Sequence, residues 1–516
     1  MRPNRTARFT SLVTAIALAL AFAQPSPAQY TVTDLLPLNA LVSEANAINA
    51  SGQVVGYAMG ENADGTYFSC GFLWENGQST NLFAQYPEIL AGSALGINDQ
   101  GQVIGYCYTD RLTAFVWQDG RLSLLGPLPG DLESQPVAIN NAGQVIGYSL
   151  RPDEQDPYSS VYHACLWQDG SVADLSAGGM EYIQAINDSG QVVGQTAASA
   201  ACLWQNGATT MLDPSGVMLA SIPSAINASG QVVGFGCTAS YRQHAFVWLP
   251  QPAYGLAAGM NDIGSGIDTI LNPSDDPGVT VSSVARCISD AGQVFGEASV
   301  VALDQSGNEA RSIRLWVWEN GSIDMIPIPA YSVESIVGSG SGVVVGSYMT
   351  AAWESCAFSW SRETGLETVP CLDGGVYACL NDVNEAGQIV GACDAPVSIA
   401  GYTYNMSQAF MAAKVVTSVL PVSEATIVRH GRTCQVRVRI NNPGTAAVGD
   451  VTVSSVSLGG AAPLTSLPIL LGTINPGASK QCTLQFKNVP AGSLTLEIEG
   501  ACSLGNISTT QQVTAP

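Results

Sequence analysis

One ten-residue pattern recurs along this chain and constrains its fold more than any other feature. Its clearest copy is residues 225–234, Ala-Ile-Asn-Ala-Ser-Gly-Gln-Val-Val-Gly. Seven further copies, one of them degraded, end at these glycines: Gly56, Gly105, Gly147, Gly194, Gly296, Gly346 and Gly391. Consecutive copies lie 40 to 62 residues apart. A period in this range is typical of the blades of a β-propeller.

The pattern itself predicts a β-hairpin. Ala-Ile-Asn and Gln-Val-Val-Gly are extended, apolar segments separated by three residues, the third of which is glycine. Three-residue hairpin loops commonly end in a left-handed residue, and glycine adopts that conformation without a Cβ clash. We therefore assign these segments to strands a and b of each blade.

A second motif follows each hairpin and predicts strands c and d. It is an apolar segment with a tryptophan, often followed by Asn-Gly or Asp-Gly, as in residues 72–77 and 115–120. These dipeptides between extended segments are the strongest short hairpin signal. The tryptophans are Trp74, Trp117, Trp167, Trp204, Trp248, Trp318 and Trp360. A residue that recurs at one position of every blade serves the repeat, so we interpret them as core residues and not as a sugar-stacking surface.

The two ends of the repeat region are complementary. Residues 30–35 resemble a strand d without a preceding blade, and the last repeat, ending near Lys414, has no tryptophan and no strand d. An N-terminal strand that completes the last blade would close the array and leave no long free edge. The prediction is an all-β protein with an eight-bladed β-propeller over residues 29–416, closed by its N-terminal strand.

Residues 420–516 have a different pattern and form a second predicted domain. Short β-branched or alternating segments are separated by Asn-Pro-Gly and similar turns. Strands at this spacing over about a hundred residues favour an immunoglobulin-like β-sandwich.

The N-terminus and the composition indicate export. Residues 1–28 have early arginines, an apolar stretch too short for a comfortable membrane span, and small residues suited to cleavage, which is typical of a signal peptide. No other segment approaches a membrane span. The net charge of -23 repels nucleic acid and anionic membranes. We expect a secreted or cell-surface protein with neither as a partner.

The 13 cysteines permit disulfides in an exported protein. Cys379 and Cys393 flank the eighth hairpin at equal distances from its loop centre, so we expect them to face each other. Cys356 and Cys371 are expected to bridge strands c and d of the seventh blade.

The connections between strands b and c, and between blades, vary in length and are therefore the expected binding face. They carry acidic and aromatic side chains. The candidate binding residues are Tyr67, Tyr86, Asp131, Tyr158, Tyr162, Tyr182, Asp275 and Asp276. Ordinary solvated loop chemistry is the competing interpretation of this set.

Motifs that would carry chemistry are missing from the sequence. It has three histidines, no zinc-type spacing, no Gly-x-Ser-x-Gly elbow, no Walker A motif and no dinucleotide fingerprint. We assign no catalytic residue, no metal ligand and no cofactor.

The two motifs together resemble the HAF-repeat family. The hairpin pattern is followed by residues 244–248, His-Ala-Phe-Val-Trp, and residues 163–167 and 408–410 match less closely. The resemblance covers about residues 47 to 414. The departures from it are Cys70, Thr113, Cys356 and Gln408, together with the missing eighth tryptophan. The resemblance implies an extracellular, propeller-like array and no established reaction.

These observations predict a secreted, non-enzymatic protein whose propeller binds a glycan or a cell-surface protein through its variable face. Two alternatives stay open. One is a propeller enzyme, a glycosidase or lyase that acts on polysaccharide, and the other is a structural protein of the cell envelope. A propeller can host all three functions, so the fold alone does not choose.

Overall fold

The computed structural model describes residues 30–516 except 63, 154–155, 157–158, 304–308, 329, 400–401, 415–421, 432, 443–447, 476–477, 503–504 and 516. The predicted signal peptide lies outside the described residues. The chain divides into two compact units, the first ending at Ala413 and the second beginning at Lys414.

The described residues of the first unit form eight four-stranded sheets. The ladders between consecutive strands are antiparallel. The first sheet has β2 (Val42–Ile48), β3 (Val54–Glu61), β4 (Tyr67–Glu75) and β5 (Gln78–Asn81); the second has β6 (Ala91–Ile97), β7 (Val103–Tyr108), β8 (Leu112–Gln118) and β9 (Arg121–Leu125); and the third has β10 (Glu133–Ile139), β11 (Val145–Pro152), β12 (Ser160–Gln168) and β13 (Ser171–Asp174). The fourth sheet has β14 (Tyr182–Ile186), β15 (Val192–Gln195), β16 (Ala201–Gln205) and β17 (Ala208–Met211); the fifth has β18 (Ala220–Ile226), β19 (Val232–Cys237), β20 (Gln243–Leu249) and β21 (Gly259–Asp262); and the sixth has β22 (Val279–Ile288), β23 (Val294–Leu303), β24 (Glu309–Glu319) and β25 (Ser322–Ile326). The seventh sheet has β26 (Ala330–Gly338), β27 (Val344–Thr350), β28 (Ser355–Ser361) and β29 (Gly365–Thr368), and the eighth has β30 (Ala378–Val383), β31 (Gln388–Ile399) and β32 (Tyr402–Lys414) together with β1 (Tyr30–Asp34). Short helices in the described part are η1 (Pro37–Asn39), η2 (Ser176–Gly178) and α1 (Gly264–Leu271).

The turns have the backbone geometry that the sequence predicts. Gly52, the last loop residue of the first a–b hairpin, has φ 81, and Asn76 and Gly77 of the first c–d turn have φ 50 and 80. Two consecutive positive φ angles match the twist of the flanking strands in a two-residue hairpin. The two motifs therefore fold as consecutive hairpins of one sheet.

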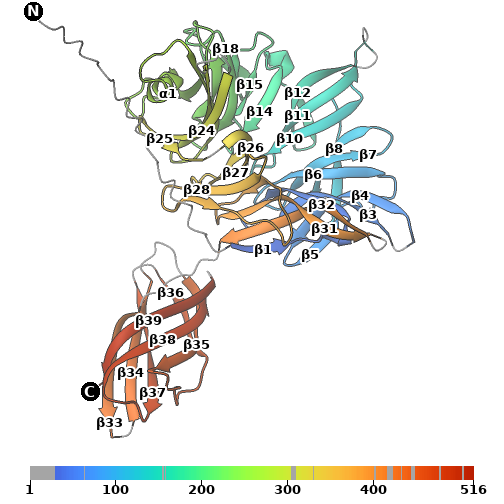
Figure 1. Cartoon of the computed structure of the whole chain (residues 1–516). Helices are drawn as coiled ribbons and strands as arrows, with labels where there is room; N and C mark the ends of the chain where they lie inside the picture. The colour runs from blue at the N-terminus through green and yellow to red at the C-terminus, as the bar shows by residue number, and fades with distance from the viewer. Residues whose placement is uncertain are drawn as a thin grey trace, which may run out of the picture. The chain divides into compact units, whose positions relative to one another are not determined.

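The sheets of the first unit are arranged in a closed cycle. The first strand of each sheet contacts the first strand of the next, and β30 of the last sheet contacts β2 of the first. The chain's first strand, β1, lies beside β32, where the Leu35 amide donates to the Ala409 carbonyl at 3.1 Å (Figure 1). The N-terminal strand therefore completes the last sheet, as the complementary ends of the repeat predict.

Two sets of hydrogen bonds join neighbouring sheets. Asn49, at the a–b turn, donates its side-chain amide to the Asn98 carbonyl at 3.1 Å, and Asn98 donates in the same way to Asn140 at 3.0 Å. Elsewhere, a strand-a serine accepts a hydrogen bond from a strand-c alanine of the preceding sheet, as Ser221 does from the Ala201 amide at 2.9 Å. The small side chain of this alanine, which is the middle residue of the His-Ala-Phe motif, lets the two strands approach.

Apolar side chains between adjacent sheets form the core. The phenylalanines of the second motif are buried completely or almost so, and they are Phe72, Phe115, Phe246, Phe358 and Phe410. Larger clusters span two sheets at a time, so each sheet is stabilised by both of its neighbours.

The second unit is built from two sheets around one core. Its described strands form a three-stranded sheet and a four-stranded sheet. The strands are β33 (Val422–His430), β34 (Thr433–Asn441), β35 (Val448–Leu458), β36 (Ile469–Ile474), β37 (Ser479–Lys487), β38 (Gly492–Cys502) and β39 (Gly505–Ala515). Alternate residues of β34 and β37 point into the shared core, among them Val436, Leu484 and Phe486.

Candidate functional site

A cavity of about 580 Å³ lies against the sixth sheet. Strands β22, β23 and β24 are 10 to 11 residues long, whereas the strands of the first five sheets have 4 to 9. Their extended parts form the wall of the cavity, together with the start of β26 and Gln243 of β20. The cavity therefore lies at the end of the sheets where the connections vary in length.

Strand register places the lining residues on one face. Val284 of β22 lies opposite Glu297 of β23, and Val301 lies opposite Arg311 of β24. Directly opposed residues of an antiparallel pair point to the same face. The cavity wall is thus a continuous surface of polar and apolar side chains.

Two β-bulges direct long side chains into this cavity. The register of β22 shifts between Ala285 and Cys287, so Arg286 is the extra residue, and a shift in β26 makes Tyr331 extra in the same way. A bulge twists the strand and changes the direction in which its side chain points. Both residues line the cavity.

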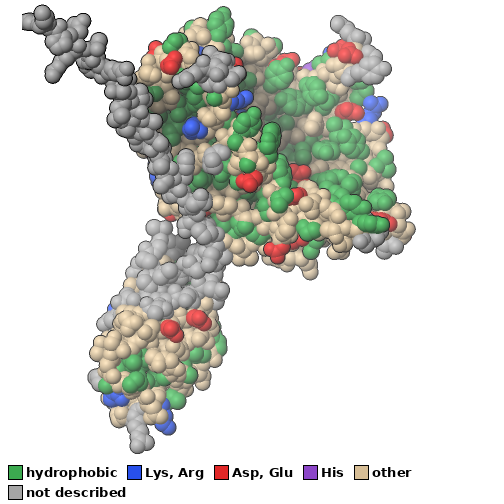
Figure 2. Space-filling model, in the orientation of Figure 1, with side chains coloured by type: hydrophobic (Ala, Val, Ile, Leu, Met, Phe, Trp, Pro, Cys, Tyr) green, Lys and Arg blue, Asp and Glu red, His purple; other side chains and the backbone are tan. Residues whose placement is uncertain are grey.

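The cavity concentrates positive charge in an acidic protein. Arg286 pairs with Glu297, whose Oε1 accepts from the arginine Nε at 3.1 Å. Arg311 donates from Nε to Ser299 Oγ at 3.1 Å, and its terminal nitrogens have no further partner among the described residues. Two guanidinium groups and one carboxylate leave the wall with a charge of about +1. The whole chain carries -23, and basic side chains are sparse over the face in Figure 2.

Two exposed aromatic side chains stand at the edge of this cavity. Tyr331 and Trp353 contact each other with ring centroids 5.8 Å apart. Trp353 is 76% exposed and has φ 62, in the left-handed region that non-glycine residues rarely occupy. The two rings therefore form an exposed aromatic pair beside the cavity.

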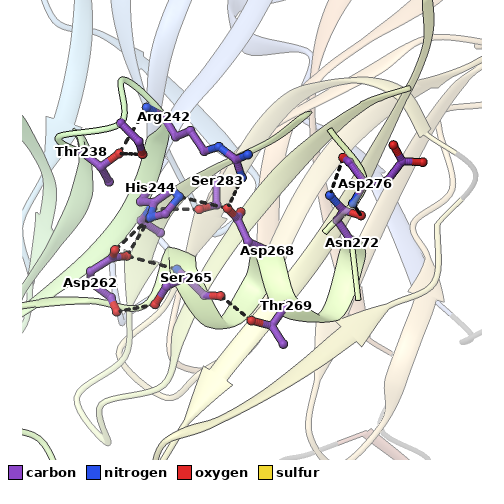
Figure 3. Close-up of polar contacts among 12 residues, drawn as sticks. Thr238, Arg242, His244, Asp262, Ser265, Asp268, Thr269, Asn272, Asp276 and Ser283 are labelled. Carbon is purple, nitrogen blue, oxygen red and sulfur yellow. Dashed lines mark hydrogen bonds and ion pairs between the residues drawn. The ribbon is translucent and has the colours of Figure 1, made fainter. Parts of the chain in front are cut away.

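A second polar cluster surrounds His244 (Figure 3). The His244 Nδ1 lies 2.9 Å from Asp262 Oδ2, and its Nε2 lies 3.1 Å from Asp268 Oδ2 of helix α1. Arg242 pairs with the same Asp268 oxygen at 3.1 Å. Hydrogen bonds that the protonated ring donates to Asp262 and then to Asp268 raise the pKa of His244 to about 9. Both ring nitrogens of His244 are therefore engaged, and the residue anchors α1 to β20.

The equivalent histidine of the third sheet has a different partner. His163 Nδ1 lies 2.7 Å from Asp131 Oδ2, and the same oxygen accepts from Ser149 Oγ at 2.6 Å. Asp131 belongs to the connection between the second and third sheets. This pair holds that connection against β12.

The structure distributes the predicted binding residues over several sheets. Tyr67, Tyr162 and Tyr182 are exposed, and Tyr162 packs edge-on against Tyr148. The Tyr86 hydroxyl accepts from the Leu122 amide at 2.8 Å, so it ties the connection between the first and second sheets to strand β9. Tyr158 lies outside the described residues.

The remaining acidic candidates also lie apart from the cavity. Asp275 and Asp276 are exposed in the turn that follows α1, where Asp276 Oδ1 caps the Gly278 amide at 2.8 Å. None of the predicted binding residues that the structure describes lines the cavity at the sixth sheet. Among the residues that the structure describes, no three metal-binding side chains are grouped together.

The strand-c tryptophans lie in or against the core clusters. Trp117, Trp167, Trp318 and Trp360 are buried, and the other three are partly buried and pack against a cluster. Trp167 also donates from Nε1 to the Gly126 carbonyl at 2.7 Å. Their environment is that of core residues.

Both proposed cysteine pairings need correction. The register of β30 and β31 places Cys379 opposite Ala392, and Cys393 opposite Ala378, so the two cysteines point to opposite faces. The cause is a bulge between Leu380 and Asp382, which breaks the symmetry that counting from the loop centre assumes. All four of these cysteines are free thiols.

The second pairing is also replaced by other contacts. The Cys356 thiol is hydrogen-bonded to Tyr348, its partner across the ladder. Cys371 lies in the connection beyond β29, and its thiol is hydrogen-bonded to Cys393.

Comparison with known proteins gives similarity of structure alone. No family model and no curated protein matches the chain. A puromycin-hydrolyzing peptidase of Mycobacterium tuberculosis is 12% identical with a TM-score of 0.39, over 81% of this chain and 62% of that one. The acylaminoacyl peptidase of Pyrococcus horikoshii is 10% identical with a TM-score of 0.37, over 79% and 59%. The β-propeller domain of the Trilobed protease of Pyrococcus furiosus is 10% identical with a TM-score of 0.34, over 72% and 94%.

These findings correct the functional expectation. The first two structures are of enzymes, whereas the sequence predicts a non-enzymatic protein that binds a glycan or a protein, and that prediction is wrong in their light. The chain spans about three fifths of the length of these two peptidases. At such identities and scores, the likeness assigns no reaction to this chain.

The site residues that the sequence analysis missed had one recognisable signal. Residues 309–316, Glu-Ala-Arg-Ser-Ile-Arg-Leu-Trp, bring three charges to a strand c, in a chain with 11% charged residues. This departure from the repeat marks the wall of the cavity.

Proposed function

We propose that the first unit is an eight-bladed β-propeller of the HAF-repeat kind and that the second is an immunoglobulin-like sandwich. The cyclic contacts of the first strands and the pairing of β1 with β32 support the propeller. The two sheets around one core support the sandwich. The leader-like residues 1–28 support export to the cell surface or beyond.

We further propose that the propeller recognises an organic carboxylate in the cavity at the sixth sheet. The single observation that carries this proposal is the guanidinium of Arg311, which faces the cavity with its terminal nitrogens unpaired among the described residues. An arginine presents a planar fork of donors that matches a carboxylate. Arg286 adds positive potential, which Glu297 partly neutralises.

The aromatic pair Tyr331 and Trp353 favours a particular kind of ligand body next to the carboxylate. Tyr331 lines the cavity, and Trp353 contacts Tyr331, so an aromatic or ring-shaped body could stack there while its carboxylate reaches Arg311. Aromatic pairs contribute about 0.5–1.5 kcal/mol beyond the area that they bury. A charge-assisted hydrogen bond contributes about 1.5–3 kcal/mol. The carboxylate is therefore the larger determinant.

The experiment compares charged and neutral forms of one probe. Isothermal titration calorimetry of the full chain with N-acetylphenylalanine and with its amide should give binding of the acid alone. Glucuronate, which has a carboxylate on a sugar, is the second arm and separates peptide-like from sugar-acid ligands. The samples are then analysed by mass spectrometry, because consumption of a probe would assign a catalytic step to the cavity.

Variants test whether Arg311 is the residue that binds the carboxylate of the probe. Arg311→Gln should weaken binding of the acid about 10- to 100-fold, since it removes one charge-assisted pair. Arg311→Lys should recover part of the affinity, because it keeps the charge and loses the fork. Arg242→Gln is the control, because Arg242 belongs to the His244 cluster and should leave affinity unchanged. Equal binding of acid and amide, or an Arg311→Gln protein that binds as wild type, would contradict the proposal.

A further inference from the structure

The connection between the seventh and eighth sheets folds back onto β31. Asp394 of β31 holds it through Oδ1, which accepts from the Val376 amide at 2.9 Å and the Tyr377 amide at 2.6 Å. The Asp394 amide in turn donates to the Tyr377 carbonyl at 3.0 Å. These bonds fix the connection immediately beside Cys393.

Two thiols meet inside this arrangement. Cys393 is 1% exposed in the cluster between the last two sheets, and the half-buried Cys371 packs against the same cluster. The two thiols are hydrogen-bonded to each other. A Cβ on Gly375 would lie 2.5 Å from Cys393 Sγ, so glycine at this position leaves the room that the sulfur occupies.

The environment makes the two thiols unequal. The hydrogen bond from Cys393 lowers the pKa of Cys371, and the same bond, with burial, raises the pKa of Cys393. The thiolate is the nucleophile in disulfide exchange. Cys371 is thus the thiol that ionises first, and it is also the more accessible of the two.

We propose that Cys371 and Cys393 form a disulfide under oxidising conditions and so tie the connection at residues 369–377 to β31. With glutathione disulfide as oxidant, the Cys371 thiolate attacks one sulfur of the oxidant. A bond forms between Cys371 and that sulfur, and one glutathione thiolate leaves. The Cys393 thiolate then attacks Cys371 Sγ and expels the second glutathione. Two protein thiols are oxidised while one glutathione disulfide is reduced to two glutathione molecules, and the two thiol protons pass to solvent and the leaving thiolates.

The test is disulfide mapping of the full chain after incubation in glutathione disulfide, with free thiols alkylated before digestion. A peptide pair linked between Cys371 and Cys393 is expected in the wild type. The same pair is expected in the control Cys379→Ser, which removes the cysteine that flanks the same hairpin. Cys371→Ser should yield no such pair. Cys393→Ser should accumulate glutathione on Cys371, because the resolving thiol is gone.

A second measurement covers variants that fold poorly. Oxidation should raise the thermal midpoint of the wild type and of Cys379→Ser, and should leave Cys371→Ser unchanged, since a cross-link constrains the unfolded chain. Three results would overturn the proposal. They are a link from Cys393 to Cys379, a link from Cys371 to Cys356, or a stable glutathione adduct on Cys371 in the wild type.

Discussion

The side-chain amide of Asn384 donates a hydrogen bond of 2.9 Å to the backbone carbonyl of Asn49, which lies 335 residues earlier in the chain. Neighbouring sheets elsewhere make the same contact, for example from Asn140 to Asn187 and from Asn187 to Asn227, each at 3.0 Å. The last sheet therefore meets the first in the way that consecutive sheets meet each other. In six of the eight a–b turns a buried asparagine both shapes its own hairpin and joins it to the next sheet, whereas the sixth and seventh turns have Ser289 and Ser339 at this position.

Replacing Asn384 with alanine should destabilise the first unit by about 2–4 kcal/mol, because four hydrogen bonds are lost at a buried site. Chemical denaturation followed by tryptophan fluorescence measures this. The matched control is Ser229→Ala at the exposed tip of another a–b turn, where the backbone amide and not the hydroxyl bonds to Asn227, and it should cost less than about 1 kcal/mol. If the two variants unfold at the same denaturant concentration, the contact between the last and first sheets contributes nothing measurable to the free energy of unfolding.

The serine–alanine contact between sheets gives a second prediction. Ser221 is buried, and its Oγ accepts from the Ala201 amide at 2.9 Å. Ser221→Ala leaves that amide without a partner, so we expect a loss of about 1–3 kcal/mol. Ser215→Ala, at an exposed turn, should be nearly neutral in the same denaturation experiment. Equal stability of both variants would show that water replaces the serine.

The hairpins of the repeat could be predicted because their signals are local. Gly52 and the pair Asn76-Gly77 adopt positive φ angles that few other residues tolerate, so the sequence at these positions determines the turn. The closing strand β1 could be predicted because an unpaired strand and an incomplete sheet require each other. Both inferences rest on hydrogen bonds that the backbone must make.

The β-bulges could not be predicted, and they account for the errors near the eighth hairpin. One extra residue in β30 moves Cys379 and Cys393 to opposite faces, and nothing in the apolar pattern marks its position. The bulge at Arg286 has the same consequence for the cavity, since it changes where a long side chain points. The cavity also needs Tyr331 from the next sheet, and such a juxtaposition depends on packing between sheets.

The strand-c tryptophans give a third prediction. Trp167 is buried between the second and third sheets and donates to the Gly126 carbonyl. Trp167→Ala should cost about 3–5 kcal/mol, because it leaves a cavity in the core. Trp167→Phe should cost less, since it keeps most of the contacts and loses the hydrogen bond. Calorimetric unfolding of both variants measures the difference, and an alanine variant as stable as wild type would indicate that the tryptophan has no core role.

The His244 cluster gives a stability that depends on pH. Hydrogen bonds that the protonated ring donates to Asp262 and Asp268 raise the pKa of His244 to about 9 in the folded chain, from an ordinary value of 6.5. A raised pKa means that the folded state binds the proton more tightly, so the stabilisation is fully present below about pH 6.5 and is lost as the pH rises through about 9.

His244→Gln introduces the residue that Gln408 provides at the equivalent position of the last sheet, and it removes the titration. The thermal midpoint of wild type should therefore exceed that of His244→Gln clearly at pH 6, and the gap should narrow by pH 9.5. Ser265→Ala, which removes a neighbouring hydroxyl and no charge, should differ from wild type by the same amount at both pH values. A wild-type advantage over His244→Gln that stays constant between pH 6 and 9.5 would mean that the imidazole is neutral between its two carboxylates.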